Sequence, residues 1–193
     1  MPTAILSVHN KSGLIEFAKG LADLGWTLLA SGGTAKMLRD NHIMVTEVAD
    51  YTKSPEILGG RVKTLHPAVH GGLLARSTEE DHDQLLHLGW GYIDLVAVNL
   101  YPFEETIAQP NFTYADAIEN IDIGGVTLIR AAAKNHERVT LACDPSDYSA
   151  ILAELRNGGI SEKTRTELAI KGFAVTAHYD TAIHDYLKKQ AES

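Results

Sequence analysis

Apolar residues recur along this chain with two different periods, and the two alternate from one segment to the next. Short apolar runs are typical of buried strands, and between them apolar positions return every three or four residues, as in helices that cover a sheet. Strands are expected at 4–8, 26–30, 44–48, 94–99 and 138–143. Helices are expected at 14–21, 35–40, 79–89, 113–120, 125–134 and 146–157. Asn10 or Ser12 is expected to cap the first helix. The alternation predicts an α/β fold, a parallel sheet of about five strands flanked by helices.

The pattern changes near the end of the chain. After the break Asn157-Gly158-Gly159, which is typical of a helix stop, one long helical stretch runs over 161–189. We therefore expect a core over 1–150. A C-terminal helical extension over 151–193 is expected to pack on this core or to lead toward a further domain.

Composition narrows the classes of function. The chain has 193 residues, of which 45% are hydrophobic and 22% charged, so it can bury a core and intrinsic disorder is excluded. The net charge of −8 argues against non-specific binding of nucleic acid. No apolar run has the roughly 18 residues of a membrane span, and the N-terminus does not resemble a signal peptide. One cysteine, Cys143, excludes a disulfide framework and a CxxC zinc site. We expect a cytoplasmic protein that acts on or binds a small molecule, with neither nucleic acid nor membrane as a partner.

The turn after the second predicted strand has the form of a phosphate cradle. It reads Ser31-Gly32-Gly33-Thr34 and runs straight into a helix. Glycines let the backbone approach an anion, and a helix start presents N–H groups with a partial positive charge. The hydroxyl groups of Ser31 and Thr34 would add donors. The alternative is a tight turn in which Thr34 is an ordinary N-cap.

A basic segment at 59–76 contains neither Asp nor Glu, although the chain is acidic overall. It carries Arg61, Lys63 and Arg76, and its Gly-Gly pairs and Pro67 predict an irregular loop of the kind that carries function. Arg61 and Lys63 could face one anion together. A solvated basic surface is the alternative, but it would leave the entropic cost of so many glycines unexplained.

Two histidines in this segment raise the question of a metal. His66 and His70 are four positions apart, which is a zinc-binding spacing on a helix. Pro67 disfavours helix at His66, and no third ligand is near in the sequence. We expect no metal site here.

Three further candidate site residues lie at the ends of later predicted strands and helices. Pro102 restricts Tyr101 to extended geometry after the fourth strand, so that the phenol either projects over the strand ends or is buried with a partner for its hydroxyl. Asp122 precedes a Gly-Gly helix start, where the helix dipole stabilises a carboxylate. Lys134 lies at the far end of that helix, and a straight helix would hold it roughly 15 Å from Asp122. Both could touch one ligand only if the helix were short or bent, or if the lysine reached back.

Four ordered segments carry a specific resemblance, which covers essentially the whole chain. These segments are Ser31–Lys36, 59–76, Asn99–Phe103 and Asp122–His136. They resemble the IMP cyclohydrolase domain of the bifunctional purine biosynthesis enzymes, which couple AICAR formyltransferase with IMP cyclohydrolase. The resemblance implies a fold like that of methylglyoxal synthase. It also implies ring closure of FAICAR to IMP and water, with neither metal nor organic cofactor. Ring closure without a cofactor is reasonable because the reaction is intramolecular, and well-oriented groups on one molecule reach effective molarities of roughly 10⁵–10⁸ M.

The resemblance also implies roles for individual residues. Lys134 would be the proton donor and acceptor, Lys63 and Tyr101 would hold the formyl oxygen, and Asp122 would orient the carboxamide or accept its proton. The implied substrate-binding residues are Ser7, Lys11, Ser31, Gly32, Gly33, Thr34, Arg61, Thr64, Asn99, Gly124 and Gly125. The implied partners are a second copy in a homodimer and a formyltransferase domain or protein.

The chain departs from the family at two places. The first turn reads His9-Asn10-Lys11-Ser12 where the family more often has Asp-Lys-Thr, which bears on affinity. Val175 stands where a histidine is usual in the segment leading to the formyltransferase domain.

Two other functions stay open. A methylglyoxal synthase-type lyase would explain the turn at 31–34, but not Lys63, Tyr101 and Lys134. A nucleotide-sensing module, similar to the regulatory domain of carbamoyl phosphate synthetase, would bind phosphate without catalysis.

Overall fold

The computed structural model confirms the predicted fold class. It describes residues 1–55, 57–58 and 62–192. In this part of the chain, five parallel strands form one sheet in the order β3-β2-β1-β4-β5. The strands are β1 (Thr3–Val8), β2 (Thr27–Ala30), β3 (Thr46–Glu47), β4 (Leu95–Asn99) and β5 (Thr140–Ala142). The first strand of the chain is therefore central, and its carboxyl end lies between those of β2 and β4.

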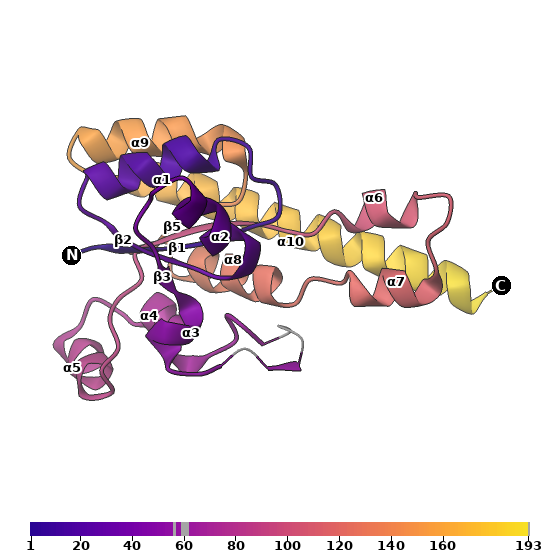
Figure 1. Ribbon diagram of the computed structural model, residues 1–193, viewed down its shortest axis with the longest axis horizontal. Coiled ribbons are helices and arrows are strands. Elements are labelled where there is room, and N and C mark those ends of the chain that lie inside the picture. Colours follow the sequence, from indigo (N-terminus) through magenta and orange to yellow (C-terminus); the bar gives the residue numbers. More distant parts are fainter. Residues whose placement is uncertain (56, 59–61, 193) are drawn as a thin grey trace.

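Helices cover both faces of the sheet, so the protein has three layers (Figure 1). The helices are α1 (Leu14–Asp23), α2 (Gly32–Asp40), α3 (Val48–Thr52), α4 (Pro67–Leu74), α5 (Glu79–His87), α6 (Phe103–Ile107), α7 (Tyr114–Glu119), α8 (Gly124–Lys134), α9 (Tyr148–Arg156) and α10 (Glu162–Ala191), with a short 3₁₀ helix at Pro145–Asp147. Helices α1 and α9 pack on one face, and α4, α8 and the first half of α10 pack on the other. No helix in the described ranges is both long enough and apolar enough to cross a membrane.

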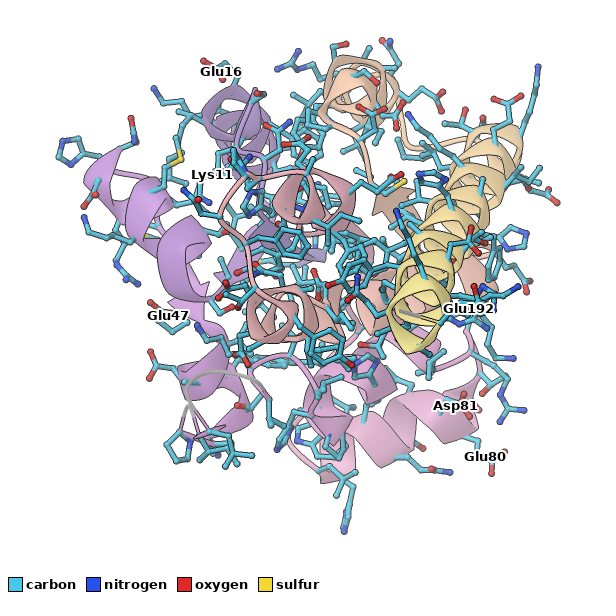
Figure 2. The ribbon with its side chains drawn as sticks, turned by 90° about the vertical axis from the view of Figure 1, so that its right-hand side faces the viewer. Lys11, Glu16, Glu47, Glu80, Asp81 and Glu192 are labelled. Atoms are coloured by element: carbon cyan, nitrogen blue, oxygen red, sulfur yellow. The ribbon has the colours of Figure 1, made fainter. Side chains whose placement is uncertain are left out.

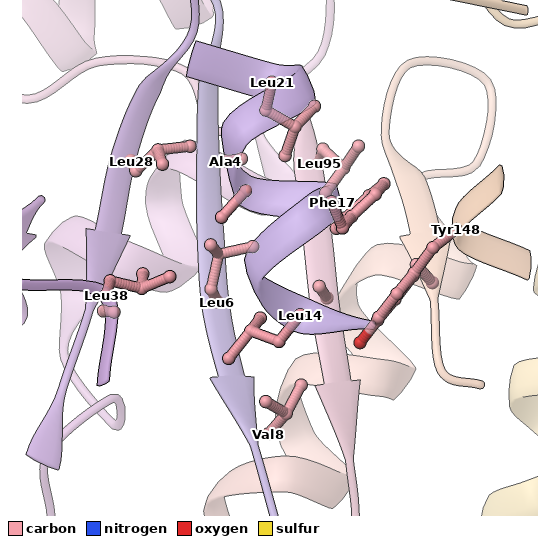
Figure 3. Close-up of a cluster of buried hydrophobic side chains, with 14 of the residues drawn as sticks. Ala4, Leu6, Val8, Leu14, Phe17, Leu21, Leu28, Leu38, Leu95 and Tyr148 are labelled. Carbon is pink, nitrogen blue, oxygen red and sulfur yellow. The ribbon is translucent and has the colours of Figure 1, made fainter. Parts of the chain in front are cut away.

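The strands are nearly all apolar because both of their faces are buried. In β1, Ala4, Leu6 and Val8 contribute to the cluster under α1 and α9, whereas Ile5 points to the opposite cluster. Figure 3 shows the first cluster, in which Phe17 of α1 packs over the strands. The Phe17 ring stacks on the ring of Tyr148, with centroids 4.2 Å apart, and so joins α1 to α9.

The long helix α10 belongs partly to the core and partly to a second cluster. Its first half packs closely on β5, since a Cβ added at Gly172 would run into the side chain of Leu141. Its second half projects beyond the sheet together with α6 and α7 (Figure 1), around Phe103, Ala117, Tyr179 and Tyr186. The expected division of the chain at residue 150 falls inside α9.

The buried guanidinium of Arg138 ties α4 to the starts of β4 and β5. It donates hydrogen bonds to Gly72 O (2.6 Å), Leu73 O (3.1 Å), Ala75 O (3.2 Å), Ile93 O (3.2 Å) and Asp94 Oδ1 (2.9 Å). The carbonyl groups at the end of a helix lack donors within the helix, and Arg138 supplies donors to the last carbonyl groups of α4. Asp94 in turn accepts from the N–H of Thr3 at 2.9 Å, so the same network reaches β1.

The predicted cap of the first helix was wrong. The N-cap of α1 is Gly13, which has a φ of 67° and no side-chain capping bond. Asn10 Oδ1 instead accepts from the N–H of Ser12 at 3.0 Å. The side chain of Asn10 is therefore used to close the turn before the helix.

The prediction of an irregular loop throughout 59–76 was also wrong, because residues 67–74 form α4. Pro67 occupies the first turn, where its fixed φ suits a helix, and His66 Nδ1 accepts from the N–H of Ala68 at 3.1 Å. A Cβ at Gly72 would lie 2.6 Å from Gly91 O, so this glycine permits close packing rather than loop flexibility. Residues 59–61 lie outside the described residues. Helices α3 and α6 were not predicted.

Candidate active site

Two lysines converge on the start of α2, at the carboxyl end of β2. A Cβ built on Gly32 would lie 3.0 Å from Lys63 Nζ, and one built on Gly33 would lie 3.9 Å from Lys11 Nζ (Lys11 is labelled in Figure 2). Gly32 has a φ of 54°, in the left-handed region that favours glycine. The first N–H groups of a helix have no partner within it and carry a partial positive charge. Two ammonium groups beside such a turn make a site for an anion.

Thr34 does not supply a donor to this site. Its side chain is 4% exposed, and its hydroxyl accepts from the N–H of Val8 at 3.3 Å and donates to Val8 O at 3.2 Å. The N-cap of α2 is Ser31, whose hydroxyl makes no capping bond. The predicted N-cap role of Thr34 was therefore wrong, and its role in binding substrate stays a prediction. Thr34 fixes α2 to the end of β1.

Asn99 organises the turn that carries Lys11. Its Oδ1 accepts from the N–H groups of His9 (2.7 Å) and Asn10 (2.8 Å), and its Nδ2 donates to Asn10 O at 2.9 Å. The turn brings Lys11 Nζ to the carbonyl oxygens of Val8 and His9, each at 3.3 Å. The carboxamide of Asn99, expected to line a base pocket, thus makes three bonds within the protein.

Asp122 lies at the start of α8, beside the end of β4. Its Oδ1 accepts from the N–H of Gly125 at 2.7 Å, and its Oδ2 accepts from the N–H of Tyr101 at 3.4 Å. Burial raises the pKa of Asp122 above the ordinary value of a carboxyl, although these N–H groups and nearby His9 act in the opposite direction. A carboxyl with a raised pKa is suited to exchange a proton with a ligand.

Tyr101 and His9 complete this part of the site. Tyr101 is 50% exposed, so its phenol projects over the strand ends rather than into the core. Its ring lies 4.9 Å from the imidazole of His9, at an interplanar angle of 53°. His9 was missed as a site residue. The available signal was its position directly after an apolar strand, where ligands of parallel sheets bind.

The anion site and the Asp122 site adjoin each other through Thr64 and Gly124. A Cβ built on Gly124 would lie 3.1 Å from Thr64 Oγ1, so the chain just after Lys63 touches the first turn of α8. Thr64 is buried, and Ser7 is half-buried at the carboxyl end of β1. The chain after Lys63 therefore links the start of α2 to the start of α8, beside Asp122. Arg61, predicted to bind substrate, lies outside the described residues.

Lys134 does not join these groups within one protomer. Helix α8 runs without a break from Gly124 to Lys134, which corresponds to about 15 Å. The exposed Lys134 side chain lines a groove of about 720 Å³ between α4, α8 and α10, whose walls include Leu74 and Phe173. Lys63 lines a separate, smaller hollow, and His66 borders both.

His66 is the N-cap of α4, and His70 lies one turn into this helix. His66 Nδ1 accepts from the N–H of Ala68, and burial lowers the pKa of His70, whose Nε2 is buried with no hydrogen-bond partner among the described residues. Within the described residues, no group of three or more His, Cys, Asp or Glu side chains is placed to hold a metal ion.

Tyr179 of α10 holds the main chain at Asp122. The N–H of Asp122 donates to the Tyr179 hydroxyl at 2.8 Å, and this hydroxyl donates to Asn120 O at 3.3 Å. Burial raises the pKa of Tyr179, which keeps the phenol neutral and able to donate. The contact joins residues 57 positions apart, and no local pattern in the sequence indicated it.

We expect Tyr179→Phe to lower the free energy of unfolding by about 1–2 kcal/mol, because it leaves the N–H of Asp122 unpaired. If turnover uses Asp122, kcat should fall by a larger factor than KM rises. Urea unfolding and steady-state kinetics measure the two effects. Tyr186→Phe, in the same cluster on the same helix, is the matched control and should leave kcat unchanged.

A parallel sheet with helices on both faces, and with polar and titratable groups gathered at the carboxyl ends of its strands, is typical of α/β domains that bind ligands at this edge. Residues 13–127 match the profile of the MGS-like domain, and the chain belongs to that family. Residues 132–193 match the AICARFT/IMPCHase bienzyme profile.

Individual relatives agree with these matches. The bifunctional purine biosynthesis protein PurH of Thermosynechococcus vestitus is 58% identical over 189 residues, which are 96% of this chain and 36% of that protein. PurH of Bacillus mycoides is 53% identical over 97% of this chain and 37% of that protein. The chain thus spans little more than a third of the length of these relatives. The crystal structure of ForH superposes with a TM-score of 0.84 at 38% identity, covering 95% of this chain and 97% of ForH.

Proposed function

We propose that this chain is an IMP cyclohydrolase, which closes the purine ring of FAICAR to give IMP and water. The observation that supports the proposal is the close approach of Thr64 to Gly124, because it links the chain after Lys63 to the start of α8, beside Asp122. A nucleotide held by its phosphate at the start of α2 would present its base toward the start of α8. The likeness to proteins named for purine biosynthesis supports the same substrate class.

The proposed reaction needs only groups that lie at these strand ends and helix starts. The carboxamide nitrogen of FAICAR attacks its formyl carbon, a C–N bond forms, and the formyl oxygen leaves as water after proton transfer. Lys63 and Tyr101 would hold the formyl oxygen while negative charge develops on it. Asp122 would orient the carboxamide or accept its proton. Lys11, with the first turn of α2, would bind the 5′-phosphate. The proposal assigns no step to a metal or an organic cofactor.

The direct test is to follow IMP formation from FAICAR by absorbance and to identify the product by chromatography. Stoichiometric IMP is expected. Formation of methylglyoxal from a phosphorylated triose, without IMP, would favour the lyase. Binding of purine nucleotides without turnover of either substrate would favour a sensing module. A partner domain or protein with formyltransferase activity would supply the substrate.

We further propose that the chain works as a homodimer in which Lys134 serves the site of the partner subunit. The length of α8 supports this, because the helix rises by about 15 Å between Gly124, beside Asp122, and Lys134 of the same protomer. The apolar groove beside Lys134 offers a surface on which a second copy could pack. Lys134 would then be the proton donor and acceptor that its own site lacks.

Mixing two inactive variants tests the assignment of Lys134. Refolding Lys63→Ala together with Lys134→Ala should restore about a quarter of wild-type activity, because half of the dimers are mixed and each mixed dimer has one intact site. If Lys134 serves its own protomer, every site in the mixture lacks one lysine and no activity returns. Sedimentation velocity on each variant checks that both remain dimeric. A monomeric wild-type protein would contradict the proposal at the outset.

A further inference from the structure

Asn99 lies at the end of β4, directly beside the end of β1. The two strands pair in parallel, and Asn99 is opposite Val8, the last residue of β1. Its carboxamide reaches beyond β1 and bonds the main chain of the next two residues, His9 and Asn10. These bonds join residues that are 89 or 90 positions apart in the sequence. They are therefore tertiary contacts that set where the turn after β1 lies.

The Asn99 carboxamide has little hydrogen-bonding capacity left for a ligand. The N–H groups of His9 and Asn10 donate to its Oδ1, at 2.7 and 2.8 Å, which uses both lone pairs of that oxygen. One N–H of its Nδ2 donates to Asn10 O at 2.9 Å. A purine base could take only the second N–H of Nδ2 without displacing the turn. The carboxamide is therefore better suited to hold the turn than to recognise a base.

Lys11 is the charged side chain that this turn carries. Its Nζ donates to Val8 O and His9 O, each at 3.3 Å, and lies 3.9 Å from a Cβ built on Gly33. Val8 O also accepts from the hydroxyl of Thr34 at 3.2 Å, so one carbonyl joins the ammonium group to α2. Within the described ranges, the two carbonyl oxygens use two of the three donors of the ammonium group. The third can face an anion at the start of α2 as long as the turn keeps its place.

We propose that Asn99 is a positioning residue for phosphate binding: its carboxamide fixes the turn at 9–11 and so holds the Lys11 ammonium at the start of α2. The inference rests on the proposed function, in which Lys11 binds the 5′-phosphate, and deepens it. Asn99 acts through Lys11 and needs no contact with the nucleotide. This role differs from the base contact that was expected of its side chain.

A double-mutant cycle tests the link between Asn99 and Lys11. Asn99→Ala removes the three bonds, Lys11→Met removes the ammonium group, and a third protein carries both substitutions. His9 and Asn10 are exposed, so water can pair with the main-chain groups that Asn99→Ala releases, and the fold should survive. Asn99→Leu, which is close in size and makes none of these bonds, is measured beside it and should behave alike. Asn41→Ala is the matched control, because this carboxamide also bonds a main-chain carbonyl, at 2.9 Å, but at the far end of α2.

Isothermal titration calorimetry with IMP gives the first readout. Lys11→Met should raise the Kd by roughly 10–150-fold, the effect of losing one charged hydrogen bond. Asn99→Ala should raise it by roughly 5–50-fold, as expected for a member of the same hydrogen-bond network. The double variant should match Lys11→Met within about twofold, since no ammonium group remains to be positioned. A double variant in which the two effects multiply would show that Asn99 contacts the nucleotide itself and would overturn the proposal.

Inorganic phosphate gives a second readout that needs neither turnover nor a base. NMR follows its binding to the substrate-free protein at the main-chain N–H of Gly33. Asn99→Ala should weaken this binding by the same factor as for IMP, and Asn41→Ala should not change it. Unchanged phosphate affinity in Asn99→Ala would overturn the proposal, as would a wild-type protein that binds no phosphate at Gly33. Wild-type protein that makes no IMP from FAICAR would refute the proposed function, while the phosphate titration would still decide the link between Asn99 and Lys11.

Discussion

Replacing Lys63 by methionine is expected to lower kcat for IMP formation by about 10²–10³-fold, the effect of removing one donor to a developing oxyanion. Methionine preserves most of the length and apolar surface of the side chain, so the fold should be retained. The Lys63 ammonium lies against Gly32 at the start of α2. The next residue in the chain, Thr64, touches α8. The proposed function assigns this ammonium to the formyl oxygen and assigns the phosphate to Lys11 and the first turn of α2.

The matched control is Lys36→Met on α2, the helix whose start Lys63 approaches. Lys36 is exposed and pairs with Asp40 at 2.6 Å, and pairs of this kind contribute about 0–1 kcal/mol to stability. It should leave kcat and KM unchanged. Lys11→Met separates binding from chemistry, since the proposal assigns Lys11 to the 5′-phosphate alone, and it should raise KM more than it lowers kcat. Near wild-type kcat in Lys63→Met, with circular dichroism showing a folded protein, would contradict the role given to Lys63.

Replacing Arg138 by methionine is expected to lower the free energy of unfolding by about 1.5–3 kcal/mol, because partly buried acceptors lose a charged hydrogen-bond donor. The substitution leaves Asp94 without its cation. It also removes one donor from each of four backbone carbonyl groups at the end of α4 and the start of β4. Leu73 O and Ala75 O keep Asn135 Nδ2 as a donor, and Gly72 O keeps the N–H of Ile93. Urea unfolding followed by circular dichroism measures the loss.

Arg76→Met is the comparison for Arg138. Arg76 pairs with Asp81 at 2.6 Å, but its side chain is 68% exposed, so solvent screens the pair. Its loss should change stability by no more than about 1 kcal/mol. Equal effects of the two substitutions would show that the network around Arg138 does not hold α4 on the sheet.

The sheet and the long helices could be predicted because burial on both faces leaves a strong periodic pattern. The strand expected at 94–99 is β4, and the stretch expected at 161–189 is most of α10. Helix α4 could not be predicted in the same way. Two of its eight residues are glycines, which weaken the local helix signal, and the reason for Gly72 is a contact with Gly91 on a distant segment.

The candidate site divides along the same line. Positions defined by local chemistry, such as the glycines that open α2 and the carboxylate before α8, could be predicted because a few neighbouring residues mark a strand end or a helix start in the sequence. Positions defined by long-range contact were misassigned or missed. The hydroxyl of Thr34 is turned inward by β1, and Tyr179 reaches Asp122 from a helix far along the chain. Neither contact is encoded in neighbouring residues.

The close packing at Gly172 has a consequence for how this chain can be recombined. The two profile matches meet between residues 127 and 132, which suggests a boundary at which segments of two proteins could be joined. That interval, however, lies within the single helix α8. Helix α10 presses on β5 so closely that a β-carbon at Gly172 has no room, so chimaeras joined in α8 would pair surfaces that never evolved together. Viable crossovers belong in the exposed turn at Gly158-Gly159, provided that the incoming helix also brings a glycine to meet Leu141.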